Sequence, residues 1–332
     1  MGPLSTILII GTGGMGRRHI SAFDKVEGTN LFCFDICKER VLEISREFEF
    51  VKPFSNLSGI PLKEVGGVAI VSPTHTHLEY MHWCTKNNIP FLVEKPISTD
   101  NNGLDPLISD VENKNVKAGV AFPRRNAAAI RKMKLMQKEG FIGEIKSIQT
   151  TFSQDFRKYR PDYQSTYYAK IATGGGIILD GLSHHVDLVT YFGGPVTSVS
   201  CMHTKSVIEG TDGEDNAIIT LRFANGIIGS VTGNQFQKPN EDRIELVGTN
   251  GNIKYERVSG ILSWNHTDCP DWNSEAIDGN WDEILYQQSM AFLDVINQKG
   301  KEMPTSLKEG QHNIKVLMAA RKSNDEKREI DL

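Results

Sequence analysis

Short apolar runs alternate with helical patterns over the first 120 residues. The runs are continuously apolar, which is typical of strands covered on both faces of a sheet. Between them, apolar residues recur at helical spacing, as at Ala22, Phe23 and Val26. This alternation predicts a parallel sheet with right-handed crossovers. The predicted strands are Ile7–Ile10, Leu31–Phe34, Val68–Val71, Phe91–Val93 and Val116–Val120.

The pattern changes after about residue 124, so we predict two domains, 1–123 and 124–332. The second begins with a helix over Asn126–Glu139 and ends with helices near Glu283–Asn297 and Gly310–Lys322. Tight turn signals join the strands between them, which favours an antiparallel sheet. The strands predicted there are Glu144–Asp155, Val196–Ser206, Ala217–Phe223, Gly226–Asn234, Arg243–Val247, Gly251–Arg257 and Ile261–Asn265.

A glycine motif, Gly11-Thr12-Gly13-Gly14-Met15-Gly16, follows the first strand and opens a helix. The pattern G-x-G-x-x-G is weak alone, but strand, helix and a later acidic residue are the context of a dinucleotide site. Gly11 allows the tight turn, Gly13 lets the backbone approach a pyrophosphate, and Gly16 lets the helix pack closely. The helix N-terminus offers N–H groups to the phosphates. A purely structural turn is the alternative.

Asp35 lies nineteen residues past the motif, at the end of the second strand. Its carboxylate is predicted to accept hydrogen bonds from the adenosine ribose and to repel a 2′-phosphate. This predicts NAD as the cofactor. NADP stays open, because Lys38 and Arg40 lie nearby.

Two later segments carry candidate chemistry. Glu94-Lys95-Pro96 follows a strand, and the carboxyl ends of parallel strands face the ligand crevice. A lysine there can stabilise a developing alkoxide, although a solvent-facing lysine explains the segment equally well. In the second segment, a single helix over Ile178–Tyr191 would place Asp180, His184 and Asp187 on one face. The alternatives there are a solvated polar face and a histidine general base with a neighbouring carboxylate.

Composition narrows the class of protein. The 332 residues carry a net charge of −4 with no basic stripe, which argues against a nucleic-acid partner. Apolar runs are too short to span a membrane, and Met1–Ile10 is predicted to be a strand rather than a signal peptide. Five cysteines without a matching histidine cluster predict no metal site and buried thiols in a reducing compartment, hence a cytoplasmic protein.

Taken together, these segments resemble the glucose–fructose oxidoreductase and inositol dehydrogenase (Gfo/Idh/MocA) family. The resemblance runs through the glycine motif, Asp35, Ser72-Pro73-Thr74-His75-Thr76-His77, Glu94-Lys95-Pro96 and Gly174–Asp187. It implies an α/β Rossmann domain, followed by an α+β domain with a large, mostly antiparallel open sheet. That sheet commonly forms the interface of a homo-dimer or homo-tetramer.

The family's functional residues map onto this chain individually. The resemblance implies that Lys95, Asp180 and His184 are catalytic, and that these three and Arg124 contact the substrate. It adds Ser72, Thr74, His77, Glu94 and Lys95 to the glycine motif and Asp35 as cofactor contacts. Relatives use a cis turn to aim the lysine, so the Lys95–Pro96 peptide is expected to be cis.

The activity implied is oxidation or reduction of a secondary hydroxyl on a sugar, inositol or nucleotide-linked sugar. His184 takes the hydroxyl proton while hydride moves to NAD, Lys95 stabilises the oxygen, and Asp180 orients the base. Two alternatives stay open: an NAD-dependent glycosidase that oxidises transiently, and a non-catalytic NAD-binding regulator. The tyrosines and Arg160 within residues 154–173 are expected to stack on a sugar, to bind a phosphate or to form oligomer contacts.

Overall fold

The chain forms two compact units. The computed structural model describes residues 5–277, 279–297 and 302–332. One unit comprises Met1–Pro123 and Asn280–Gln311, and the other comprises Arg124–Gly279 and His312–Leu332. This division differs from the predicted one, because residues 280–311 return to the first unit instead of staying with the second.

The first unit is built on a six-stranded parallel sheet with the order β3-β2-β1-β4-β5-β6. The five predicted strands are present, and the expected parallel α/β fold is confirmed. Edge strand β3 was not predicted, because it is only four residues long, contains Pro53 and has an exposed centre. The strands are β1 (Ser5–Ile10), β2 (Thr29–Phe34), β3 (Val51–Phe54), β4 (Val65–Ile70), β5 (Phe91–Glu94) and β6 (Ala118–Ala121).

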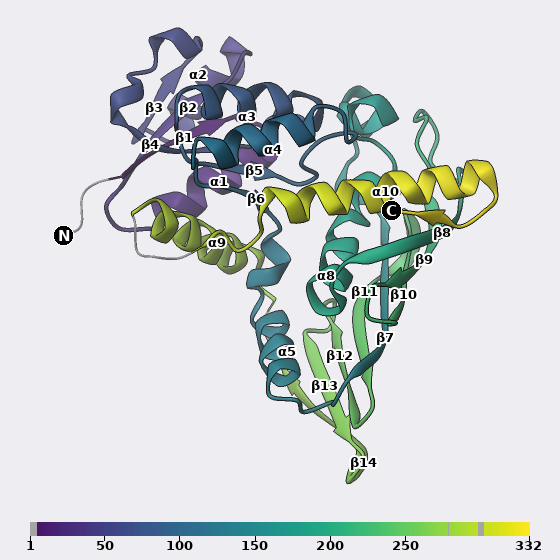
Figure 1. Cartoon of the computed structure of the whole chain (residues 1–332). Helices are drawn as coiled ribbons and strands as arrows, with labels where there is room; N and C mark the ends of the chain where they lie inside the picture. The colour runs from purple at the N-terminus through teal and green to yellow at the C-terminus, as the bar shows by residue number, and fades with distance from the viewer. Residues whose placement is uncertain (1–4, 278, 298–301) are drawn as a thin grey trace. The chain divides into compact units, whose positions relative to one another are not determined.

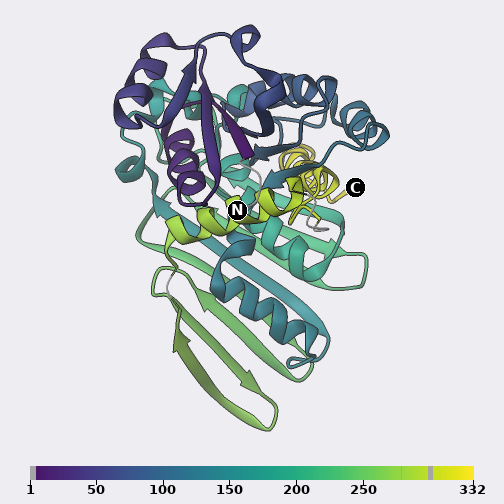
Figure 2. The ribbon, with the colours of Figure 1, turned by 90° about the vertical axis from the view of Figure 1, so that its left-hand side faces the viewer.

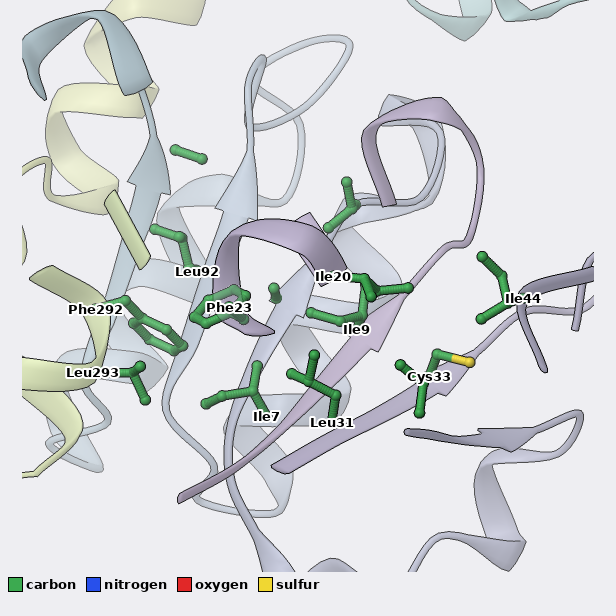
Figure 3. Close-up of a cluster of buried hydrophobic side chains, with 14 residues drawn as sticks. Ile7, Ile9, Ile20, Phe23, Leu31, Cys33, Ile44, Leu92, Phe292 and Leu293 are labelled. Carbon is green, nitrogen blue, oxygen red and sulfur yellow. The ribbon is translucent and has the colours of Figure 1, made fainter. Parts of the chain in front are cut away.

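Helices α1 (Gly14–Asp24), α2 (Lys38–Glu47), α3 (His77–Lys86) and α4 (Leu104–Asn113) connect these strands, and α9 (Trp281–Ile296) joins them from late in the chain. Helices α1 and α9 lie side by side (Figure 2), with the rings of Phe23 and Phe292 edge to face at 6.2 Å. Figure 3 shows Phe292 and Leu293 in one buried cluster with Ile7 and Phe23. This shared core explains why residues 280–311 belong to the first unit.

The second unit is built on a nine-stranded sheet with the order β14-β13-β12-β11-β7-β10-β9-β8-β15. Neighbouring strands are antiparallel except β7 and β10, so the expected mostly antiparallel sheet is confirmed. Strand β14 was not predicted, since its residues are polar and exposed. The strands are β7 (Ile145–Asp155), β8 (Val196–Thr204), β9 (Asn216–Phe223), β10 (Ile228–Asn234), β11 (Phe236–Gly248), β12 (Gly251–Glu256), β13 (Ile261–His266), β14 (Cys269–Ala276) and β15 (Ile330–Asp331).

Helices α5 (Ala128–Lys138) and α8 (Ser183–Gly193) cover one face of this sheet (Figure 1). Buried side chains alternate with more exposed ones along the central strands, as Ile219 and Leu221 do in β9. The other helices of this unit are α6 (Phe156–Tyr159), α7 (Ile177–Asp180) and the later part of α10 (Leu307–Glu326). Among the described residues, no helix is long and apolar enough to cross a membrane.

The predicted single helix over Ile178–Tyr191 is wrong, because a turn separates α7 from α8. The Ile177 carbonyl accepts hydrogen bonds from the N–H groups of both Gly181 and Leu182, which widens the helix at that point. The Ser183 hydroxyl donates to the Asp180 carbonyl, a bond that competes with continued helix. Asp180 and His184 therefore lie on two successive short helices.

The expectation that all five cysteines are buried is also only partly met. All five are free thiols, and three of them are buried. Cys37 is half-buried and Cys269 is exposed on edge strand β14, so burial does not account for them.

Candidate active site

The glycine loop between β1 and α1 is shaped by close backbone contacts. Gly11 has φ +100°, and a Cβ on it would lie 2.6 Å from the Ser72 nitrogen. A Cβ on Gly16 would lie 2.1 Å from the Gly11 carbonyl oxygen. At Gly13, by contrast, a Cβ would meet nothing within 4 Å. The loop is thus tight at its two ends and open in the middle.

Asp35 braces this loop from the end of β2. One carboxylate oxygen accepts hydrogen bonds from the N–H group of Thr12 at 2.8 Å and from its hydroxyl at 2.9 Å. The other oxygen accepts the N–H group of Cys37 at 2.9 Å. Asp35 is buried, whereas the next residue, Ile36, is 79 % exposed. Asp35 therefore organises the loop and keeps only limited acceptor capacity for a ligand.

Glu94 holds the backbone of Lys95. One Glu94 oxygen accepts a hydrogen bond from His19 Nε2 of α1 at 2.8 Å, and the other accepts the Lys95 N–H group at 3.0 Å. Glu94 and His19 are both buried, whereas Lys95 is partly exposed. Both Glu94 oxygens are engaged within the protein, so the geometry favours a positioning role for Glu94 over direct contact with a cofactor.

His77 connects the loop after β4 to the loop after β5. Its Nε2 lies 2.8 Å from the Ser72 carbonyl oxygen, and its Nδ1 lies 3.0 Å from the Pro96 carbonyl oxygen. The side chain is 1 % exposed, and burial lowers the His77 pKa although the neighbouring carbonyls oppose that shift. The Lys95–Pro96 peptide is cis, which confirms the expectation. His77 thus ties two loops together, and Ser72 takes part through its backbone.

The loop after β4 continues in a 3-10 turn over Thr74–Thr76. The hydroxyl groups of Ser72 and Thr76 share a hydrogen bond of 2.7 Å, and Thr74 is buried. The turn is therefore ordered by contacts of its own as well as by His77.

In the second unit, a glycine-rich turn over Gly174–Gly176 precedes α7. Gly176 has φ +90°, and a Cβ on it would lie 2.6 Å from a Glu214 carboxylate oxygen. That oxygen accepts the N–H group of Ile178 at 3.0 Å and a bond from Arg321 Nη2 at 2.9 Å. The Glu214–Arg321 pair is largely buried. It fixes the start of the helix that ends at Asp180.

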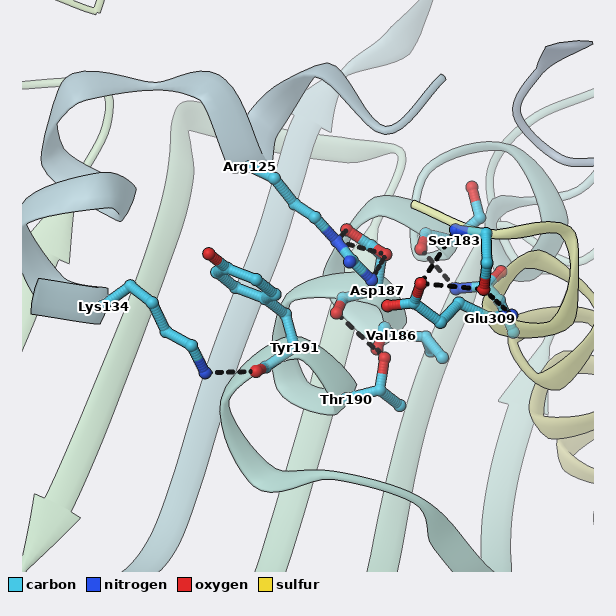
Figure 4. A network of polar contacts seen from close by, with 10 residues as sticks. Arg125, Lys134, Ser183, Val186, Asp187, Thr190, Tyr191 and Glu309 are labelled. Carbon is cyan, nitrogen blue, oxygen red and sulfur yellow. Dashed lines mark hydrogen bonds and ion pairs between the residues drawn. The ribbon is translucent and has the colours of Figure 1, made fainter. Parts of the chain in front are cut away.

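Helix α8, which carries His184, is anchored by Asp187. Arg125 donates to both Asp187 oxygens, with the shortest bond, from Nη2, at 2.7 Å (Figure 4). Both side chains are buried. The prediction that Asp187 shares a solvated polar face with His184 is wrong, because its charge is paired inside the protein.

A second buried network lies under α8 and contains Arg124. Its Nη1 donates to Asp242 at 2.9 Å and to His185 Nε2 at 2.9 Å, and Arg257 also donates to Asp242. Burial, together with the charge of Arg124, lowers the His185 pKa to about 3, so His185 is neutral near pH 7. Arg124 is 7 % exposed. This placement favours a structural role beneath α8 over the predicted contact with substrate.

Comparison with known proteins places these features in a family. Residues 5–122 match the model of an oxidoreductase family with an NAD-binding Rossmann fold, and residues 130–254 match that of the GFO/IDH/MocA C-terminal domain. The chain belongs to the Gfo/Idh/MocA family. The family resemblance noted from the sequence is therefore confirmed, and with it an NAD-binding oxidoreductase.

Two Gfo/Idh/MocA relatives illustrate the similarity. Myo-inositol 2-dehydrogenase of Thermotoga maritima is 26 % identical over 335 residues, covering 98 % of this chain and 97 % of that protein. Levoglucosan dehydrogenase of Pseudarthrobacter phenanthrenivorans is 27 % identical over 285 residues, covering 75 % and 73 % respectively. A solved levoglucosan dehydrogenase complex with NADH and levoglucosan shares the fold, with a TM-score of 0.89, 22 % identity and coverage of 98 % of this chain and 99 % of that one.

The residues of this Gfo/Idh/MocA chain fit a dinucleotide. The open position at Gly13 leaves room for a pyrophosphate beside the N-terminus of α1, where N–H groups favour an anion. Asp35 stands at the end of β2, where the ribose is held in such folds. Within the part of the chain that the structure describes, no group of three His, Cys, Asp or Glu residues is placed to hold a metal ion.

Several residues of the site had no signal in the sequence. The ion pairs Arg125–Asp187, Arg321–Glu214 and Arg124–Asp242 join side chains 62, 107 and 118 positions apart, and no local spacing marks such pairs. His19 is different, since it lies on α1 three residues past the glycine motif and faces Glu94. Its position on the buried side of an amphipathic helix was a usable signal.

Proposed function

We propose that this chain is an NAD-dependent dehydrogenase acting on a secondary hydroxyl of a sugar, an inositol or a nucleotide-linked sugar. The observation that carries the proposal is the joining of the cofactor loops to the lysine loop. Gly11 packs on Ser72, and His77 links Ser72 to Pro96, next to Lys95. A relative that is 26 % identical over nearly the whole chain is a myo-inositol dehydrogenase, which supports this class of substrate.

Each unit contributes part of the proposed machinery. The cofactor is held by the glycine motif, by Asp35 and by the turn carrying Ser72 and Thr74. Bound NAD supplies a hydride acceptor. Lys95 holds the substrate oxygen and stabilises its negative charge, while His184 accepts the hydroxyl proton at a ring nitrogen. Asp180, the last residue of α7 and four residues before His184, orients that base.

NAD rather than NADP is the proposed cofactor. A 2′-phosphate would meet the buried Asp35 carboxylate, which already accepts three hydrogen bonds from the loop. Exposed Ile36 offers apolar surface beside it. Measuring rates with both cofactors at matched concentrations tests this, and a preference for NADP would contradict it.

The deciding experiment is a panel of sugars, inositols and sugar nucleotides with NAD and NADP, followed by absorbance of the reduced cofactor. We expect net NADH from at least one class, and loss of turnover with retained NADH binding in Lys95→Met. Release of a leaving group from aryl glycosides without net NADH would indicate a glycosidase instead. NADH binding without turnover of any substrate would indicate a regulator.

We also propose that the chain forms homo-oligomers through the sheet face opposite α5 and α8. Met202 pairs with Ile218 there, and both are more than half exposed, as is Ile228. Exposed apolar neighbours on an otherwise polar sheet are typical of an interface. Light scattering of the wild type and of Met202→Lys with Ile218→Lys tests this, and a monomeric wild type would contradict it.

A further inference from the structure

Residues 154–173 lead from β7 to the glycine turn before α7, and the structure separates the roles of their aromatic residues. Two tyrosines have protein partners that account for them. Tyr163 is buried with Phe156 and Ile208 and donates its hydroxyl to the Glu209 carbonyl at 2.8 Å. The Tyr159 hydroxyl accepts a hydrogen bond from Asn240 at 2.7 Å. These contacts hold the segment against the sheet.

Tyr167 and Tyr168 are arranged differently. Their ring centroids are 4.0 Å apart with an interplanar angle of 31°, and Phe156 supports Tyr168 edge-on at 5.4 Å. Both rings are partly exposed. Burial raises the pKa of each hydroxyl, and the Asp180 carboxylate raises it further, so both stay protonated at neutral pH. The two tyrosines therefore lie within electrostatic range of Asp180, one of the proposed catalytic residues.

Arg160 completes this group. Its Nε donates to the Tyr168 hydroxyl at 3.1 Å, its Nη1 donates to the Tyr159 carbonyl at 2.9 Å, and it also interacts with the Asp180 charge. The two bonds use Nε and Nη1, and the side chain is exposed. The guanidinium is thus fixed by two bonds while its outer edge keeps N–H donors for a ligand.

The net charge of residues 154–173 also favours an anionic ligand. Residues 154–173 contain four basic and two acidic side chains, in a chain whose net charge is −4. A guanidinium fork held in place suits the two oxygens of a carboxylate or phosphate. Its charge also offsets the repulsion that Asp180 would exert on an anionic substrate.

We propose that Arg160, Tyr167 and Tyr168 form a subsite that selects a sugar carrying an anionic substituent. The tyrosine rings contact the ring of the sugar, and Arg160 binds its carboxylate or phosphate. This rests on the proposed dehydrogenase function and narrows its substrate class to sugars that carry a carboxylate or a phosphate.

Matched substrate pairs test the subsite on the full-length protein with NAD. The pairs are D-glucose with D-glucuronate, and D-glucose with D-glucose 6-phosphate, with UDP-glucose as a further phosphate source. We expect an anionic member to have the lower KM, and Arg160→Gln to raise that KM by about 10- to 100-fold, the range of a charged hydrogen bond. The KM for D-glucose should change little.

Arg157→Gln is the matched control, since Arg157 lies in the same segment, is exposed and has its Nε 4.0 Å from the Asp155 carboxylate. It should leave every KM unchanged. If no panel member is turned over, calorimetric binding of the same pairs to the NADH-loaded protein replaces KM. The carboxylate and phosphate arms show which anion is preferred.

A lower KM for D-glucose than for its anionic partners would overturn the proposed subsite. An equal change of both KM values in Arg160→Gln would do the same. Neither result would contradict the proposed dehydrogenase function. A wild-type protein that binds NADH but turns over no substrate of the panel would instead contradict the proposed function. Thermal midpoints of the two variants check that neither substitution unfolds the protein.

Discussion

The two glycine-rich turns of this molecule look alike in sequence, but the helix N-termini that follow them differ in whether a protein carboxylate is bound there. At Gly11–Gly16, the N-terminus of α1 faces open space at Gly13. At Gly174–Gly176, the N-terminus of α7 is already occupied by Glu214, whose carboxylate accepts the Ile178 N–H group and pairs with Arg321. Both turns present N–H groups to an anion. The first leaves that place for a ligand, whereas the second fills it from within the chain.

The difference shows what a glycine motif can and cannot indicate. Positive φ and close backbone approach are common to both turns, so these features mark a tight turn rather than a binding site. What separates them is the presence of an internal anion, which comes from a distant part of the chain. A helix capped internally is suited to holding Asp180 in place, and an open one is suited to binding phosphate.

The largest expected effect tests whether catalysis and cofactor binding are carried by different turns and helices. His184→Asn should reduce hydroxyl oxidation by about 10²- to 10⁴-fold, the usual contribution of general acid–base catalysis. NADH affinity, measured by fluorescence titration, should be unchanged because the cofactor loops lie in the first unit. If His184→Asn keeps the wild-type oxidation rate, His184 is not the catalytic base.

Gly176→Ala probes the filled turn. Its φ of 90° and ψ of 150° cost an alanine about 1–3 kcal/mol, and the clash with Glu214 adds about 1–3 kcal/mol. Gly194→Ala is the control, because Gly194 has φ 87° and ψ −159° but no atom within 4 Å of its Cβ. Denaturant unfolding should show the larger loss at Gly176. Equal losses would mean that Glu214 moves aside freely.

Gly13→Ala probes the open turn. Gly13 has φ −67°, which alanine adopts without strain, and its Cβ meets no protein atom. Unfolding free energy should change by less than about 0.5 kcal/mol. The Kd for NADH should rise about 5- to 150-fold, from about 1–3 kcal/mol of crowding against the pyrophosphate. Gly16→Ala, which clashes with Gly11, should instead destabilise the fold, and an unaltered Kd in Gly13→Ala would place the dinucleotide elsewhere.

The last prediction concerns the pH dependence of stability and the network beneath α8. His185 has a folded pKa of about 3, so between pH 6.5 and 3 the unfolded chain binds a proton that the folded chain does not. Stability should therefore fall as pH falls through this window, by at most about 1.4 kcal/mol per pH unit from this group. His185→Gln, which keeps an acceptor for Arg124, should flatten the dependence of Tm on pH below 6.5. An unchanged slope would show that other groups control it.

Local features of this chain could be predicted, and distant pairings could not. The apolar strands, the glycine loop and Asp35 follow from apolar runs and from spacing within a few tens of residues, whereas the edge strands β3 and β14 do not. The ion pairs Arg125–Asp187 and Arg321–Glu214 join residues 62 and 107 positions apart, and nothing in either neighbourhood marks them. The break between α7 and α8 coincides with the Ile177 carbonyl shared by Gly181 and Leu182 and with the bond from the Ser183 hydroxyl, and helical periodicity registers neither.

The same limit applies to Arg124 and to the unit boundary. The family resemblance implied that Arg124 contacts the substrate, but its partner Asp242 is a buried residue 118 positions away. Helix α9 was predicted from its periodicity, yet periodicity does not say which core its apolar face enters. Phe292 could have packed on either sheet, and only tertiary structure assigns it to Phe23.

The segment from Asn280 to Leu332 also affects the order in which the two units can fold during synthesis. It supplies α9 to the first unit, and it supplies Arg321 and the rest of α10 to the second. A nascent chain that has emerged only to residue 279 therefore carries two unfinished cores, one lacking Phe292 and the other lacking the partner of Glu214. Neither unit can complete its folding during most of its synthesis.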